Sequence, residues 1–138
     1  MMPSLVLDCS VTIAWLMPDE SSGVAVSILE QVAERGAIVP SIWPLEVGNV
    51  LLIAQRAKRI TLEQRQKALY ILRELPIIID ADTSIHAWLE TTNLAEQHNL
   101  TLYDSSYLEL ALRTSKPLAT FDNALKKAAK IAKVNLSF

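Results

Sequence analysis

Three aspartates stand at or just after the ends of apolar runs that the sequence predicts to be β-strands. Asp8 ends the first run, Asp104 follows a candidate strand over residues 100–102, and Asp122 follows another over residues 117–120. In open parallel α/β sheets, ligands bind outside the carboxyl ends of the strands. We therefore expect these three carboxylates to gather at one edge of a sheet.

Glu46 is a fourth candidate, because it is an acid on a largely apolar predicted helix whose other residues include Ile42, Leu45, Val47 and Val50. Burying a carboxylate there is costly unless its charge is paired or bound to a cation. Four converging carboxylates would repel one another and raise one another's pKa unless a divalent cation neutralised them. Oxygen ligands select a hard cation such as Mg²⁺ or Mn²⁺, and phosphodiester hydrolysis is the natural chemistry of such a site.

Each of these carboxylates also has a purely structural interpretation. Asp is a leading N-cap residue, so each of the three aspartates could simply cap the helix that follows it. Glu46 could lie on a solvent-facing stripe. Asp80 and Asp82 also follow a predicted strand, and there we expect helix capping and solvation rather than a role in the site.

The composition excludes several other kinds of site. The chain has 138 residues with 13 basic and 15 acidic side chains, and its three glycines are too far apart for a dinucleotide fingerprint or a Walker A loop. The single cysteine, Cys9, cannot form an intramolecular disulfide. No apolar stretch approaches the ~20 residues that span a bilayer, and no basic segment opens a signal peptide. We expect a cytoplasmic protein without a membrane partner.

Short apolar strands alternate with helices along the chain, which predicts an α/β fold. We expect one domain over residues 1–138, with a parallel sheet of about four to five short strands covered by helices on both faces. Ile77–Ile79 is an unbroken β-branched run, typical of a strand buried on both faces. The other predicted strands are residues 5–7, 37–39, 100–102 and 117–120, and residues 134–136 are a candidate last strand that would close the sheet.

Capping residues and breakers delimit the predicted helices. The sequence predicts helices from Ser10 to a stop at Pro18, from Ser21 or Ser22 to Gly36, from Ser41 to about Arg59, from Thr61 to about Leu75, over 83–98, over 103–114, and from Asp122 to about Ala132. The helices on either side of residue 60 should form a helical hairpin inserted after the second strand.

Four motifs in order make the chain resemble the PIN-domain ribonucleases, and among them the VapC-type toxins of prokaryotic toxin–antitoxin operons. The motifs are VLDCSV at 6–11, the acid at Glu46, YDSSY at 103–107 and LATFDNAL at 118–125. The resemblance covers essentially the whole chain. It implies a catalytic quartet of Asp8, Glu46, Asp104 and Asp122 that holds Mg²⁺ or Mn²⁺.

The resemblance also assigns supporting residues and marks two departures. Ser10 and Thr120 match hydroxyl positions beside the first and last acids, where a hydroxyl can orient a carboxylate. Ser105 stands where alanine is more usual, and no further acid follows closely after Asp122. The second departure leaves less support for a second tightly held ion.

The basic residues are concentrated near the C-terminus, where residues 101–138 carry six bases and three acids. Arg113, Lys116, Lys126 and Lys127 could lead RNA toward the site, although the lysines could equally be a solvated helix face. The resemblance implies that residues 51–75 serve homodimerisation and receive the antitoxin's C-terminal segment, a helix-in-groove mode. Trp15, Trp43 and Trp88 are expected to be core or interface anchors.

Two other classes of site fit the sequence poorly. A phosphatase of the haloacid dehalogenase type would need a second aspartate where Ser10 stands, and a receiver domain would need an adjacent acidic pair and a late lysine. The main hypothesis is a Mg²⁺- or Mn²⁺-dependent endoribonuclease that acts as the toxin of a type II toxin–antitoxin pair. The alternative is a PIN-like RNA- or protein-binding regulatory module without significant turnover.

Overall fold

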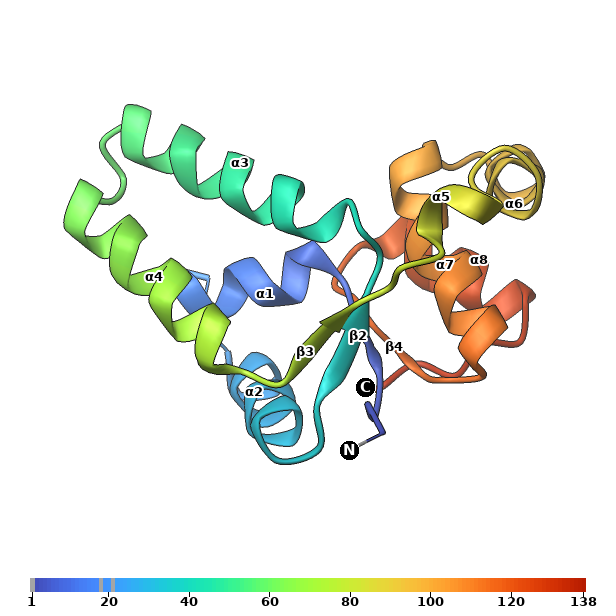
Figure 1. Cartoon of the computed structure of the whole chain (residues 1–138), viewed down its shortest axis with the longest axis horizontal. Helices are drawn as coiled ribbons and strands as arrows, with labels where there is room; N and C mark the ends of the chain where they lie inside the picture. The colour runs from blue at the N-terminus through green and yellow to red at the C-terminus, as the bar shows by residue number, and fades with distance from the viewer. Residues whose placement is uncertain (1, 18, 21) are drawn as a thin grey trace.

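A four-stranded parallel sheet forms the centre of the computed structural model, which describes residues 2–17, 19–20 and 22–138. Its strands, β1 (Val6–Leu7), β2 (Ala37–Val39), β3 (Ile77–Ile79) and β4 (Leu118–Ala119), have the spatial order β3-β2-β1-β4. An isolated parallel bridge between Leu118 and Leu136 extends the sheet beyond β4. The predicted α/β class with a parallel sheet is confirmed (Figure 1).

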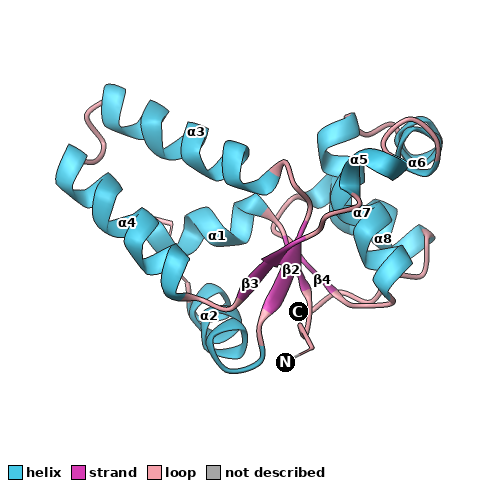
Figure 2. Ribbon diagram, viewed as in Figure 1, coloured by secondary structure: helices cyan, strands magenta, loops and turns pink. Residues whose placement is uncertain are grey.

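Eight helices within the described residues cover the sheet. They are α1 (Cys9–Leu16), α2 (Gly23–Arg35), α3 (Trp43–Arg56), α4 (Leu62–Glu74), α5 (Thr83–His86), α6 (Glu90–His98), α7 (Leu102–Thr114) and α8 (Asn123–Ile131). Figure 2 shows α1 to α4 on one side of the sheet and α5 to α8 on the other. The predicted hairpin is α3–α4, and the capping box predicted at Thr61 and Gln64 is present.

The predicted strand over residues 100–102 is absent from the described structure. Instead α7 begins at Leu102, because the Thr101 hydroxyl accepts a hydrogen bond from the Asp104 N–H and caps the helix. The helix predicted over 83–98 is also divided, and Trp88 and Leu89 lie between α5 and α6. There the Thr92 hydroxyl donates to the Ala87 carbonyl (2.7 Å), so a side chain competes with the helical backbone pattern.

The prediction that Ile77–Ile79 is buried on both faces is wrong, because β3 is the edge strand of the sheet. Ile78 and Ile79 are 47% and 50% exposed. Three helix boundaries also differ from the prediction. Helix α1 starts at Cys9 rather than after Ser10, α3 has Ile42 rather than Ser41 as its N-cap, and α3 ends at Arg56. Pro18 and Ser21, predicted as a helix stop and a possible cap, lie outside the described residues.

The main core lies between the sheet and both helical layers. Its largest fully buried side chains include Leu5, Leu7, Leu51, Tyr107 and Leu118. Trp43 is also in this core, where its indole N–H donates to the Thr12 hydroxyl. No helix in the described part of the chain is long and apolar enough to cross a membrane.

Candidate metal centre

The four acids of the predicted quartet come from four separate elements. Asp8 directly follows β1 and is the N-cap of α1, while Asp122 follows β4 and is the N-cap of α8. Glu46 and Asp104 lie in the first turns of α3 and α7. Backbone pairing continues past the strands, because the Asp8 N–H donates to the Ala119 carbonyl (3.0 Å).

The charges of these acids are close enough to affect one another. Burial raises the pKa of Asp8, which is only 5% exposed, and the charge of Asp104 raises it further. Burial also raises the pKa of Glu46, with additional contributions from Asp8 and Asp104. The pKa of Asp104 is raised by burial and by the nearby charge of Asp122. Fold topology therefore brings all four carboxylates into one electrostatically coupled group.

Two hydroxyls hold the Asp8 carboxylate. Ser10 Oγ and Thr120 Oγ1 both donate to Asp8 Oδ2, at 2.8 and 2.6 Å. The same hydroxyl oxygens accept hydrogen bonds from the backbone N–H groups of Phe121 and Asp122 (3.0 Å each). Ser10 and Thr120 were predicted to orient acids. Their hydrogen bonds connect the Asp8 carboxylate to the backbone of residues 121 and 122, which includes Asp122.

Tyr107 is the residue in this site that the sequence analysis did not single out for a role. Its fully buried ring places the phenolic oxygen 2.5 Å from Glu46 Oε1, and the hydroxyl donates to that carboxylate. Burial and the negative charge of Glu46 raise the pKa of Tyr107. The available sequence signal was its position three residues after Asp104, which places both side chains on one helix face.

Within the described residues, no Lys, Arg or His forms an ion pair with any of the four acids. The donor type and charge of this group suit a hard divalent cation. In this conformation, no three acidic, histidine or cysteine side chains of the described ranges lie close enough together to ligate one ion. Asp8, Glu46 and Asp122 each accept a hydrogen bond from a different partner within the protein, namely Ser10, Tyr107 and the Leu125 N–H.

Cys9 lies beside this group but is not suited to nucleophilic chemistry. The side chain is buried, and burial together with the charges of Glu46, Asp8 and Asp104 raises its thiol pKa to about 12. The thiolate is the reactive form of cysteine. The acids are therefore the groups of this site with usable chemistry.

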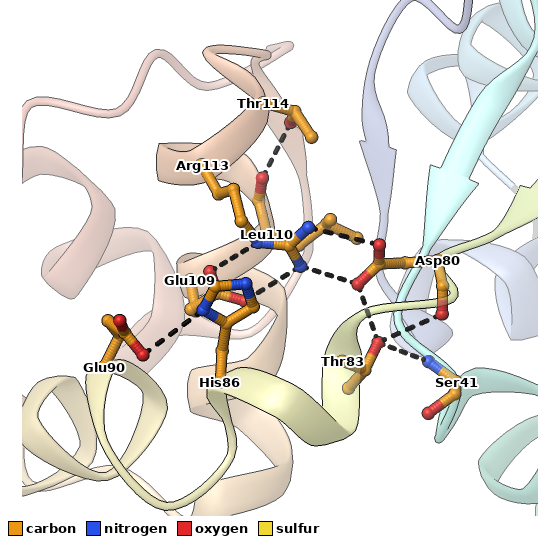
Figure 3. A network of polar contacts seen from close by, with 9 residues as sticks. All are labelled: Ser41, Asp80, Thr83, His86, Glu90, Glu109, Leu110, Arg113 and Thr114. Atoms are coloured by element: carbon orange, nitrogen blue, oxygen red, sulfur yellow. Dashed lines mark hydrogen bonds and ion pairs between the residues drawn. The ribbon is translucent and has the colours of Figure 1, made fainter.

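Arg113, which was predicted to contact RNA, is held by two carboxylates in the structure (Figure 3). It forms ion pairs with Asp80 (2.6 Å) and with Glu109 (2.8 Å). The prediction that Asp80 is solvated is wrong, because this side chain is only 7% exposed. Burial raises its pKa, but hydrogen bonds from Arg113 and Thr83 outweigh that effect and hold the pKa of Asp80 below its usual value.

The predicted basic residues do not all lie near the acids. Lys126 and Lys127 are on α8, the helix that Asp122 caps. Lys126 lies over the rings of Phe121 and Phe138, at 5.9 and 5.0 Å from their centres. Lys116 precedes β4 and Asp122 follows it, so these two residues lie toward opposite ends of that strand.

An uncharged hollow lies next to the acids. It has a volume of about 260 Å³, and its lining includes Ile42, Leu45, Ala87, Leu102 and Tyr103. Leu45 and Tyr103 directly precede Glu46 and Asp104 in the sequence. The hollow adjoins α5 and the turn that follows it. Ile85 of α5 and Trp88 and Leu89 of that turn are exposed, Trp88 to 91%.

A model of the PIN domain family matches residues 5–131 of this chain. Several solved structures share its fold, including these three. PAE2754 from Pyrobaculum aerophilum is 18% identical, with 91% of this chain and 84% of that chain covered and a TM-score of 0.65. FitAcB from Neisseria gonorrhoeae is 16% identical, with 96% and 95% covered and a TM-score of 0.66.

The third structure, VapBC2 from Rickettsia felis bound to a DNA fragment from its promoter, is 21% identical, with 96% of each chain covered and a TM-score of 0.61. None of the curated proteins matches the sequence. At these identities, the structural likenesses show a shared fold.

Proposed function

Because this chain belongs to the PIN domain family, we propose that it is a divalent-cation-dependent endoribonuclease and the toxin of a type II toxin–antitoxin pair. The observation that carries the proposal is the coupled group of four carboxylates contributed by α1, α3, α7 and α8. An arrangement that raises the pKa of several acids without a neighbouring base is costly to the fold, and such costs are typical of functional sites.

In this proposal Asp8, Glu46 and Asp104 hold the principal ion, either Mg²⁺ or Mn²⁺. Asp122 supports that ion, a second ion or the attacking water. A bound ion of this kind supplies a water of lowered pKa and stabilises the charge that develops on the phosphate. Ser10 and Thr120 orient Asp8 through their hydrogen bonds.

Lysines on α8 are the proposed RNA contacts nearest the acids. Lys126 and Lys127 belong to the helix capped by Asp122, so their charges would attract the RNA backbone beside the site. Lys116 remains a proposed contact farther along the RNA. We also propose that residues 1–138 form one PIN-like domain that acts in the cytoplasm.

The antitoxin is the proposed protein partner of the α3–α4 hairpin. A hollow of about 240 Å³ lies between α1 and this hairpin, and its lining includes the apolar residues Trp15, Leu51, Ile60, Ala68 and Ile71. An apolar groove between helices suits the apolar face of a partner helix. The resemblance to VapC-type toxins and the likeness to the VapBC2 structure support this partner.

A second copy of the chain is the proposed partner of the apolar patch formed by Ile85, Trp88 and Leu89. A two-fold interface sets identical surfaces against each other, so an uncharged patch avoids repulsion between like charges. The adjoining hollow is also uncharged. The resemblance implied residues 51–75 for both partners. We propose instead that the homodimer contact lies on Ile85, Trp88 and Leu89, and that the α3–α4 hairpin binds the antitoxin.

RNA cleavage by the purified protein tests the enzymatic proposal. End-labelled RNA should be cut with Mg²⁺ or Mn²⁺, and EDTA or Asp8→Asn should abolish the cutting. Asp82→Asn is the matched control, because this neutralises an exposed acid outside the group and should retain activity. Cleavage in EDTA, or full activity of Asp8→Asn, would contradict the mechanism.

The alternative is a PIN-like RNA- or protein-binding regulatory module without significant turnover. Saturable RNA binding without cleavage under any metal condition would support it. The biological role has a separate test. Expression of the chain should arrest growth, and the product of an adjacent small open reading frame should relieve the arrest.

A further inference from the structure

Arg113 connects α7 to the end of β3 (Figure 3). Its Nη1 and Nη2 donate to the two carboxylate oxygens of Asp80, at 3.2 and 2.6 Å. Its Nε and Nη2 also donate to Glu109 of the same helix, at 2.8 and 3.1 Å. Four hydrogen bonds from a planar guanidinium fix direction as well as distance, so Asp80 is held in one place relative to α7.

Asp80 passes this constraint to the segment that leads into α3. Thr83 Oγ1 donates a hydrogen bond to Asp80 Oδ2 (2.9 Å). Thr83 Oγ1 also accepts a hydrogen bond from the backbone N–H of Ser41 (3.0 Å). Ser41 lies in the turn between β2 and α3. Arg113, Asp80, Thr83 and Ser41 therefore form a continuous polar connection from α7 to the start of α3, which we call the α7–α3 tie.

The two helices joined by this tie carry two of the proposed ligands in their first turns, Glu46 on α3 and Asp104 on α7. Helix α7 also reaches α3 directly, through the hydrogen bond from Tyr107 to Glu46. Two separate attachments constrain the tilt of the α3 start as well as its distance from α7. A site of several side chains requires this kind of precision in its supporting structure.

Stability alone is a poor explanation for the tie. Glu109 and Asp80 are 5% and 7% exposed, and two buried carboxylates around one guanidinium leave an excess negative charge. Well-packed apolar residues stabilise a fold at least as well as a buried ionic group of this kind. The value of the ionic group lies in its directional geometry.

We propose that Arg113, Asp80 and Thr83 are positioning residues, which hold the start of α3 where Glu46 and Asp104 serve the same divalent cation. This inference rests on the metal-dependent function proposed above. It also gives Arg113 a role different from RNA contact, because four of the five donors that a guanidinium offers are already used within the protein.

Thr83→Val is the most specific perturbation of the tie. Valine preserves the shape and β-branching of threonine but removes the hydroxyl, and it leaves the contacts of Arg113 with both acids in place. Thr83→Ser is the matched control, because serine keeps the hydroxyl. Among the described residues, Thr83 Oγ1 forms hydrogen bonds with Ser41 and Asp80 and with none of the four acids of the quartet.

The first measurement is the distance between spin labels on α3 and α7, by pulsed electron–electron double resonance without metal. Asn49→Cys and Leu112→Cys place the labels at exposed positions. Cys9 is buried with a raised thiol pKa, so it should not label at neutral pH. We expect a narrow distance distribution in the parent and in Thr83→Ser, and a broader one in Thr83→Val.

The second measurement is Mn²⁺ affinity by calorimetry. Loss of a direct hydrogen-bond partner of a metal ligand typically weakens binding by about 10- to 100-fold. Thr83 contacts no proposed ligand and acts through the start of α3, so we expect Thr83→Val to bind Mn²⁺ measurably more weakly, by about tenfold at most. Thr83→Ser should bind as the wild type does.

An unchanged distance distribution in Thr83→Val would overturn the inference, and so would wild-type Mn²⁺ affinity in that variant. A lower melting temperature with neither change would show a purely structural role, and would also overturn it. A wild-type protein that binds no Mn²⁺ would refute the proposed function instead. In that case the distance distribution would still decide whether the tie holds α3.

Discussion

Asp8→Asn should make the metal-free protein more stable, although it removes a proposed metal ligand. Asp8 is 5% exposed, and burial and the charge of Asp104 raise its pKa. Asparagine removes the buried charge but keeps an oxygen that can accept the hydrogen bonds of Ser10 and Thr120. The cost of burying a carboxylate is thereby removed without opening a cavity.

The expected gain follows from two opposing contributions. Each of the two hydroxyl bonds should weaken by about 1 kcal/mol when its acceptor loses the charge, whereas burying a carboxylate costs several kcal/mol. We expect a net increase of about 1 kcal/mol in the free energy of unfolding at pH 7.5, equivalent to about 4 °C in melting temperature for a domain of this size. Urea and thermal unfolding in EDTA would measure both quantities.

The pH dependence of this difference has a definite sign. A pKa raised in the folded state means that the folded protein binds more protons than the unfolded chain between the two pKa values, so its stability rises as pH falls. Wild-type Asp8 becomes neutral as pH falls through its raised pKa. The advantage of Asp8→Asn should therefore shrink in mildly acidic buffer.

Metal should reverse the order of stabilities. A ligand at 100 times its dissociation constant stabilises the protein that binds it by about 2.7 kcal/mol, so saturating Mn²⁺ should make wild type more stable than Asp8→Asn. The reasoning is refuted if Asp8→Asn is less stable than wild type in EDTA at pH 7.5.

Asp80→Asn is the matched control, at the end of another strand of the same sheet. Arg113 and Thr83 lower the pKa of Asp80, so its charge stabilises the fold above the pKa of the unfolded chain, and that contribution is lost as pH falls through the lowered folded value. Removing one partner of a buried ion pair should cost about 3 kcal/mol. The same chemical change should therefore have opposite effects at Asp8 and Asp80.

Three further predictions test the site and its surfaces. Tyr107→Phe should weaken Mn²⁺ binding by about tenfold in calorimetry, because it frees the carboxylate that the hydroxyl holds; unchanged affinity would remove this residue from the site. Trp88→Glu should convert a dimer to a monomer in sedimentation experiments, because a charge in an apolar interface is left unpaired. The exposed Tyr70→Glu is its control, and a Trp88→Glu dimer would exclude this contact. Lys127→Gln should weaken RNA binding and lower its salt slope by about 1, an effect that Lys116→Gln should reproduce only if RNA extends to the opposite edge of the sheet.

Local rules were enough to predict much of the fold. The alternation of short apolar runs with helices indicated the parallel sheet, and the Thr61 capping box depends only on neighbours three residues apart. The placement of Asp8 and Asp122 beyond β1 and β4 was also predictable, because chain direction sends the ends of parallel strands to one edge. Glu46 was predicted from the apolar character of its helix.

Errors arose where a local pattern had two solutions. Residues 100–102 are too few for hydrophobic periodicity to distinguish a strand from a helix start, and the Thr101 cap decided for the helix. The apolar run Ile77–Ile79 predicted a strand correctly, but its exposure depends on strand order, and β3 has a neighbour on only one side.

The sequence indicated Ser10 and Thr120 as supporting hydroxyls, but only the tertiary structure identified which acid each supporting side chain contacts. The hydrogen bond from Tyr107 to Glu46 joins residues 61 positions apart, and the bond from Thr120 to Asp8 joins residues 112 apart. The sequence determined which residues carry the charges, because residue type and strand direction are local properties. The packing of distant segments decided which hydroxyl or guanidinium group contacts each carboxylate. These contacts depend on the spatial order of the helices and strands, which the spacing of residues along the chain does not give.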